Sequence, residues 1–202
     1  MHSAILFDLY GTLIELTTDT HPYAALARTL RHQDRTLAIN TALTNPNMTL
    51  ARFAQRCGVS PEEVHAYCAE LESDLANVRL FDDVQPTLQA LRDRNVKLAL
   101  VSNLAAPYKQ PVQRLGLERY FDVLIYSCDV RVRKPDPRIY EITLGALNCA
   151  AKDAAMVGDS FASDVTGPAA IGIKGIHLTR SGRPTQAEHV ITTLRELICL
   201  TA

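Results

Sequence analysis

Tryptophan is absent from this chain of 202 residues, and no stretch approaches the ~20 apolar residues that a membrane-spanning helix requires. An excess of charge of one sign is also lacking, because 21 Lys and Arg residues are balanced by 22 Asp and Glu residues. Binding to nucleic acid or to an anionic membrane surface normally needs a basic excess. We therefore expect neither nucleic acid nor a membrane as a partner.

Cysteines are few, odd in number and never three positions apart, which argues against a disulfide framework and against a Cys-x-x-Cys zinc site. They are Cys57, Cys68, Cys128, Cys149 and Cys199. The first apolar run of the chain is interrupted at Asp8, so the N-terminus does not have the pattern of a secretory signal. We expect a soluble, cytoplasmic protein with reduced thiols.

The chain is rich in hydrophobic residues, at 47%, and it opens with an apolar run that ends on an acid. Residues 4–7 (AILF) have the pattern of a buried parallel strand. Asp8 follows directly, and Gly11 permits a tight turn just beyond it. Reactive groups in open α/β sheets lie past the carboxyl ends of the strands, which is where Asp8 falls.

Residues 16–80 carry helical signals and no convincing strand pattern. Ser60 and Glu63 have the spacing of a capping box around a proline, which predicts a helix start. One helix is predicted to begin at Pro22 and to run to Leu30, and another to run from about Met48 to Cys57, where Gly58 stops it. We predict that this segment is a small all-helical insertion.

Strands and helices alternate from Asp82 onward. Strands are predicted at residues 97–101, 123–126, 154–157 and 172–178, with helices at about 83–94, 107–115, 137–147 and 193–199. Repeated strand-helix-strand units imply parallel strands joined by right-handed crossovers. The predicted fold class is therefore α/β, with a parallel sheet built from residues 1–15 and 81–202.

Polar residues with chemical potential follow the predicted strands. They form four groups: Asp8, then Ser102 with Asn103, then Lys134, then Asp159 with Asp164. Because the carboxyl ends of parallel strands meet at one edge of a sheet, these groups should converge. A carboxylate nucleophile, a hydroxyl, a cation and a further pair of carboxylates are what aspartyl-phosphate chemistry requires.

In that chemistry Asp8 attacks phosphorus and, together with Asp159, holds a Mg²⁺ ion. Ser102 and Lys134 contact the remaining phosphoryl oxygens. Each residue also has a plainer interpretation. Ser102 could cap a helix, Lys134 could be a solvated loop cation, and Asp164 could be an N-cap. The occurrence of all four groups at strand ends, in one chain, favours a shared site.

The same segments carry a resemblance to a known family. Residues 7–13 (FDLYGTL), 101–103 (VSN), 133–140 (RKPDPRIY) and 157–164 (VGDSFASD) resemble the four motifs of the haloacid dehalogenase-like hydrolase superfamily. The resemblance spans nearly the whole chain. It implies a Rossmann-like three-layer core with a parallel sheet, into which residues 16–80 are inserted as a helical cap.

The resemblance also implies roles for individual residues. Catalytic roles fall on Asp8, Tyr10, Ser102, Asn103 and Lys134; substrate or phosphate binding on Thr12, Ser102, Asn103 and Lys134; and Mg²⁺ binding on Asp8, Tyr10 (through its carbonyl), Asp159 and Asp164. The implied activity is Mg²⁺-dependent hydrolysis of a small phosphate monoester through an aspartyl intermediate. The sequence leaves open whether the protein is a monomer or a homodimer.

Tyr10 is a departure from the family pattern. Phosphatases that this chain resembles carry an aspartate there, as the general acid, and such a group typically contributes ~10²–10⁴-fold. A tyrosine resembles the haloacid dehalogenase branch, in which the halide leaves without a proton. Asp159 favours the metal and phosphate instead, because the dehalogenases lack the metal. Two alternatives remain: a 2-haloacid dehalogenase, and a weak or non-catalytic binder of phosphate or metal.

Substrate-reading residues are harder to find in the predicted cap. Dehalogenases of this superfamily usually supply an arginine from a Trp-Arg segment, and this chain has no tryptophan. Arg28, Arg31 or Arg35 could replace it. We name His21, Arg28 and Arg31 as the candidates that face the site.

Overall fold

A six-stranded sheet organises the protein, and the computed structural model describes residues 2–18 and 20–200. Its strands are β1 (Ala4–Phe7), β4 (Lys97–Ser102), β5 (Val123–Tyr126), β6 (Ala154–Gly158), β7 (Lys174–Leu178) and β8 (Val190–Ile191), in the order β5-β4-β1-β6-β7-β8. Every neighbouring pair is parallel. The predicted α/β class with a parallel sheet is confirmed.

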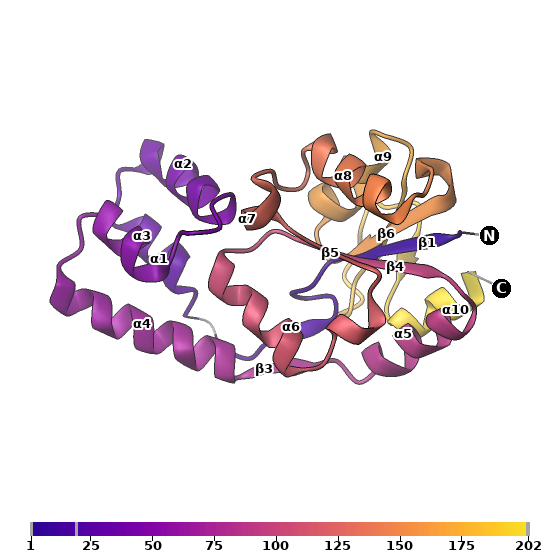
Figure 1. Cartoon of the computed structure of the whole chain (residues 1–202), viewed down its shortest axis with the longest axis horizontal. Coiled ribbons are helices and arrows are strands. Elements are labelled where there is room, and N and C mark those ends of the chain that lie inside the picture. Colours follow the sequence, from indigo (N-terminus) through magenta and orange to yellow (C-terminus); the bar gives the residue numbers. More distant parts are fainter. Residues whose placement is uncertain (1, 19, 201–202) are drawn as a thin grey trace.

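Helices cover both faces of this sheet (Figure 1), which gives the predicted three layers. One face carries α5 (Val84–Asp93), α6 (Gln110–Arg114) and α10 (Leu197–Leu200), and the other carries α8 (Pro137–Leu147) and α9 (Gly167–Ala169). A short helix, α7 (Ser127–Val130), follows β5 directly. None of the helices in the described part of the chain is long and apolar enough to cross a membrane.

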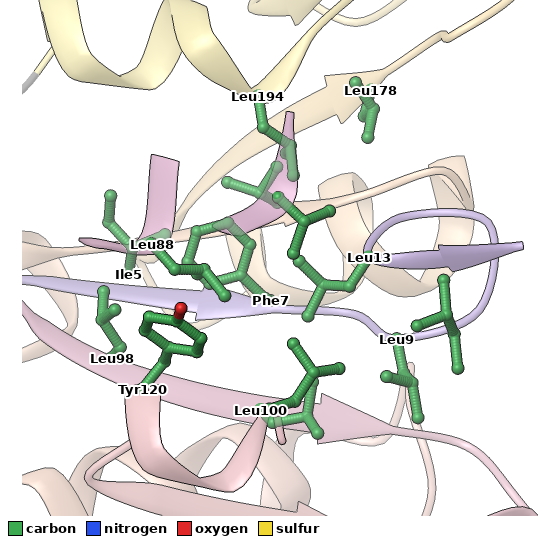
Figure 2. Packing of buried hydrophobic residues seen from close by; sticks show 14 of the residues in the cluster. Ile5, Phe7, Leu9, Leu13, Leu88, Leu98, Leu100, Tyr120, Leu178 and Leu194 are labelled. Atoms are coloured by element: carbon green, nitrogen blue, oxygen red, sulfur yellow. The ribbon is translucent and has the colours of Figure 1, made fainter. Parts of the chain in front are cut away.

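Strand β1 lies at the centre and is buried on both faces. Ile5 and Phe7 join one apolar cluster, while Ala4 and Leu6 join the cluster on the opposite face. The first cluster, seen in Figure 2, includes Leu88, Leu98, Leu100, Tyr120, Leu178 and Leu194. Burial on both faces explains why the strands read as continuous apolar runs rather than as alternating ones.

The helical segment contains α1 (Pro22–Arg28), α2 (His32–Leu43), α3 (Leu50–Arg56) and α4 (Pro61–Ala76), which lie together at one end of the molecule (Figure 1). The Ser60–Glu63 capping box is present at the start of α4, as predicted. Helix α2 was not predicted. Arg35 on this helix donates to the carbonyls of Arg28 and Leu30 at 2.9 and 3.0 Å, so it holds the end of α1.

Two short strands that the sequence did not reveal link this segment to the sheet. β2 (Ile14–Leu16) and β3 (Val78–Leu80) pair antiparallel. Next to them, the fully buried Asp74 accepts hydrogen bonds from the hydroxyls of Thr18, Thr20 and Tyr108. Asp74 lies on α4, whereas Tyr108 lies in the part of the chain that carries the sheet. This carboxylate therefore joins the helical segment to the sheet-bearing part.

Candidate active site

Asp8 extends from the carboxyl end of β1 into a buried ion-pair cluster. One of its oxygens, Oδ1, is 2.7 Å from Nζ of Lys134, and the same Nζ is 2.7 Å from Oδ1 of Asp164. The Lys134 and Asp164 side chains are 2% and 0% exposed. The structure therefore brings together three residues that are 126 and 30 positions apart, as the strand-end argument predicted.

Two glycines, Gly11 and Gly158, leave space for the carboxylates of Asp159 and Asp164. Gly11 has φ +81°, and a Cβ atom there would lie 2.4 Å from Oδ2 of Asp159. Similarly, a Cβ on Gly158 would lie 2.2 Å from Oδ2 of Asp164. Both positions therefore need glycine, because a side chain at either one would displace a carboxylate. Asp164 itself sits on a π-helical turn (Phe161–Thr166), where the Ser160 amide donates to it at 2.9 Å.

Three carboxylates converge here, since single oxygens of Asp8, Asp159 and Asp164 all lie within 4.8 Å of one another. With Lys134 as the one ammonium within this cluster, its formal charge is −2 when all four groups are ionised. A divalent cation would neutralise that charge. Hard carboxylate oxygens are also the ligands that Mg²⁺ prefers, so these residues fit the ion.

Burial and the neighbouring charges shift the pKa values of the groups in this cluster. Burial raises the pKa of Asp8, and the Asp164 charge adds to this against the opposing effect of Lys134. Burial and then the Asp8 charge raise the pKa of Asp159. Burial alone would lower the pKa of Lys134, but Asp8 and Asp164 hold it above its usual value. Lys134 therefore stays charged, while the two carboxylates lack enough positive charge beside them.

Polar residues predicted for phosphate binding surround Asp8. The hydroxyls of Ser102 and Thr12 lie 3.5 Å from Oδ1 and Oδ2 of Asp8, respectively. The Asn103 side chain is turned elsewhere: it donates to the carbonyl of Lys134 and accepts from its amide, both at 2.8 Å. Asn103 thus joins the end of β4 to the loop that carries Lys134, which positions the lysine.

Tyr10 lies two residues after Asp8, and its hydroxyl donates to the carbonyl of Tyr108 at 3.0 Å. Its ring meets the Tyr108 ring edge to face, with centroids 5.8 Å apart. Burial, followed by the charge of Asp74, raises the pKa of Tyr10 above its ordinary value. Proton donation from this hydroxyl would need its bond to Tyr108 to break, so the geometry favours a packing role for the side chain.

A cavity of about 650 Å³ opens beside Asp159, between the helical segment and the sheet. Its lining comprises Tyr10, Gly11, Glu15, Leu16, His21, Tyr23, Ala24, Ile39, Leu43, Phe81, Asn103, Leu104, Ala105, Tyr108 and Asp159. His21 is thus placed at the cavity, as predicted. Arg28 and Arg31 are exposed and are not among the lining residues, and Arg35 is occupied at the end of α1.

One supporting network was not predicted from the sequence. The Asp83 carboxylate accepts two hydrogen bonds from Arg180, both at 3.0 Å, and further ones from Thr193 and the Leu194 amide. Burial alone would raise the pKa of Asp83, but these donors outweigh it and lower the pKa. Arg180 also donates to the carbonyl of Thr12, so the network stabilises the turn that follows Asp8. An isolated Asp and Arg 97 positions apart give no sequence signal of this contact.

Comparison with known proteins agrees with these features. The family model for haloacid dehalogenase-like hydrolases matches residues 2–172. The chain is 27% identical over 196 residues to a ribulose-1,5-bisphosphate 5-phosphatase of Halopiger xanaduensis, covering 91% of this chain and 76% of that protein. It is 28% identical over 135 residues to a phosphoserine phosphatase of Thermus thermophilus, covering 66% of this chain and 54% of the relative, so that match spans about half of that relative's length.

Solved structures give the same picture of the fold. A HAD phosphatase from Thermococcus onnurineus superimposes with a TM-score of 0.71 at 29% identity, covering 98% of this chain and 97% of the other. A 2-haloacid dehalogenase from Pseudomonas syringae also has a TM-score of 0.71, at 22% identity and 99% coverage of both chains. The second likeness reflects the shared fold alone.

Proposed function

The chain belongs to the haloacid dehalogenase-like hydrolase family, and on that premise we propose that it is a Mg²⁺-dependent phosphatase of small phosphate monoesters. The reaction would proceed through an aspartyl intermediate on Asp8. The observation that carries the proposal is the convergence of three carboxylates, two of which form ion pairs with the buried Lys134. Phosphatase relatives at 27–30% identity support the same activity.

The proposed first step is attack of an Asp8 oxygen on phosphorus, which forms an acyl phosphate and breaks the bond to the leaving oxygen. The departing oxygen leaves as an anion and takes its proton from solvent water. Ser102, Thr12 and Lys134 surround Asp8 and would bind the phosphoryl oxygens as charge develops on them. Water then cleaves the acyl phosphate, which releases inorganic phosphate and restores the Asp8 carboxylate. Asn103 holds Lys134 in place through both of its amide atoms.

Mg²⁺ would be held by the carboxylates of Asp8, Asp159 and Asp164 with the Tyr10 carbonyl, and it would supply Lewis-acid stabilisation of the phosphoryl charge. The protein's contribution is the −2 charge of the cluster and the burial of Asp8, Lys134 and Asp164. A dehalogenase would have no use for this charge, because a second carboxylate beside Asp8 weakens it as a nucleophile. The acidic cluster therefore favours phosphate over halide chemistry.

Phosphate release from p-nitrophenyl phosphate, with Mg²⁺ and with EDTA, tests this function. The leaving group needs little protonation, so the missing aspartate at position 10 does not mask the nucleophile. We expect turnover with Mg²⁺ and a loss of at least about 100-fold in EDTA, since a Lewis acid contributes several kcal/mol. Equal rates in both buffers would contradict the metal assignment. No release at all would contradict the phosphatase.

Two alternatives would then be separated by a second assay. Tyr10 stands where a dehalogenase of the family also has a tyrosine, and chloride release from 2-chloropropionate would reveal that chemistry. A protein that releases neither phosphate nor chloride, yet is stabilised thermally by Mg²⁺ with phosphate, would be a binding member of the family.

Tyr10 variants should separate an acid role from a packing role. We expect Tyr10→Phe to change the rate on an alkyl phosphate by less than about threefold, because the hydroxyl is already bonded to Tyr108. Tyr10→Asp should raise that rate by up to ~10²–10⁴-fold, the typical contribution of a general acid. Its effect on p-nitrophenyl phosphate should be small. A large loss in Tyr10→Phe, confined to alkyl phosphates, would instead assign the proton to the tyrosine.

A further inference from the structure

We propose that the leaving group of the substrate is apolar in body and neutral or cationic, and that it carries no second anionic group. This inference rests on the proposed phosphatase activity and concerns the cavity beside Asp159. Its volume of about 650 Å³ is that of a small-molecule site. The apolar, hydrogen-bonding and charged groups of the cavity wall define the class of leaving group.

Three tyrosines contribute aromatic rings to the cavity wall, and their hydroxyl protons are already used in hydrogen bonds within the protein. Tyr10, Tyr23 and Tyr108 line the cavity, and all three hydroxyls donate inward: to the Tyr108 carbonyl, the Met48 carbonyl and the Asp74 carboxylate. The Tyr108 ring lies 5.8 Å from that of Tyr10 and 6.1 Å from that of Tyr23, centroid to centroid. A polyhydroxylated sugar would therefore find apolar surface where it needs hydrogen-bond partners.

Helix α2 separates this cavity from positive charge. Its Ile39 and Leu43 line the cavity, whereas Asn40 and Thr44, each one position further along, line a second hollow of about 230 Å³. The second hollow is lined by Arg131, Arg133 and Arg138, the last paired with Asp136 on the same wall. The hydroxyl of Ser127 donates to the carbonyl of Leu43 at 2.6 Å and fixes the helix end between the two spaces. The basic side chains thus face the other side of α2.

The charged groups on the cavity wall are mainly acidic. Glu15 and Asp159 line it beside His21, and within the described ranges 2–18 and 20–200 neither a lysine nor an arginine does. Asp159 is also a proposed Mg²⁺ ligand, so Glu15 is the acidic group that remains on the wall when the ion is bound. Lys134 is buried between Asp8 and Asp164, where it serves the reacting phosphate. Arg79 is the register partner of Glu15 across the β2–β3 pair but is not part of the wall. A carboxylate or a second phosphate on the leaving group would lie near the Glu15 carboxylate, with neither a lysine nor an arginine on the wall to offset the repulsion.

A matched series of aryl phosphates tests the inference. The three substrates are 4-methylphenyl, 4-(aminomethyl)phenyl and 4-carboxyphenyl phosphate, which have similar size. The carboxylate makes its phenol somewhat more acidic than 4-methylphenol, so leaving-group chemistry alone would favour the carboxylate and cannot imitate the expected loss. We expect kcat/KM for the carboxylate to be at least tenfold below those of the other two. Equal or better hydrolysis of the carboxylate would overturn the inference and leave the phosphatase standing. Failure of all three substrates and of p-nitrophenyl phosphate would instead overturn the phosphatase. Failure of all three while p-nitrophenyl phosphate is hydrolysed would overturn the inference, because the 4-methylphenyl substrate fits the proposed class.

A pair of neighbouring alanines provides the matched control. Ala24 of α1 lines the cavity, whereas Ala25 does not. We expect Ala24→Arg to raise kcat/KM for the carboxylate about tenfold and to lower it for the aminomethyl substrate. Ala25→Arg should leave the three-substrate profile unchanged. Glu15→Gln should reduce the difference in kcat/KM between the carboxylate and aminomethyl substrates, although it adds no cation. An unchanged profile in both Ala24→Arg and Glu15→Gln would show that this wall does not select the leaving group.

Discussion

Asp8→Asn is expected to abolish phosphate release, by on the order of 10⁴-fold or more, because an amide cannot supply the attacking oxygen. The fold should survive, since Lys134 keeps its ion pair with Asp164 at 2.7 Å and the strand before Asp8 is unchanged. We expect the melting temperature to move by only a few degrees, which for a chain of this size corresponds to about 1 kcal/mol. Steady-state assays and thermal unfolding measure both quantities.

Asp93→Asn is the matched control, because Asp93 is an exposed aspartate whose carboxylate accepts only from Gln89 among the contacts described for it. It should keep full activity. Acid quench during turnover followed by peptide mass spectrometry should find phosphate on the peptide containing Asp8 in the wild type and in Asp93→Asn, but not in Asp8→Asn. An Asp8→Asn variant as active as the wild type would eliminate the aspartyl mechanism.

The core of the fold could be predicted because its signals are local. Strands β1, β4 and β6 are buried on both faces, which compels continuous apolar runs that the sequence displays directly. Helix α2 escaped prediction because it buries only Ala42, so it has almost no amphipathic pattern. Strands β2 and β3 have three residues each, too few for an alternating pattern to be visible.

The candidate site likewise has one part that could be predicted from the sequence and one part that could not. Parallel strand ends sufficed to place Asp8, Ser102 and Asp159 at one edge of the sheet, and the structure brings them together. No comparable rule predicts from the sequence which way a side chain points. Nothing in the sequence shows that the Tyr10 hydroxyl bonds to Tyr108, or that Arg28 and Arg31 are exposed and do not line the cavity. These orientations depend on packing between segments that are far apart in the chain.

The largest combined effect on stability and activity is expected at Lys134, through Lys134→Met. This change leaves Asp8 and Asp164 buried side by side without a cation, and removing one partner of a buried ion pair typically costs about 3–5 kcal/mol. In EDTA the melting temperature should fall by roughly 10 °C, at ~2–4 °C per kcal/mol for a chain of this size. Turnover with Mg²⁺ should fall by ~10²–10³-fold, as for other lost charge donors.

Lys109→Met is the control for Lys134→Met, because Lys109 forms an ion pair of similar length, 2.9 Å, with Asp129 at the surface. Those side chains are 33% and 42% exposed, so the pair contributes at most about 1 kcal/mol and its loss should barely move the melting temperature. The double variant Lys134→Met/Asp164→Asn separates stability from catalysis: removing one of the stranded charges should recover part of the stability and none of the activity. Equal melting temperatures for Lys134→Met and Lys109→Met would refute the buried charge cluster as the organising feature of the site.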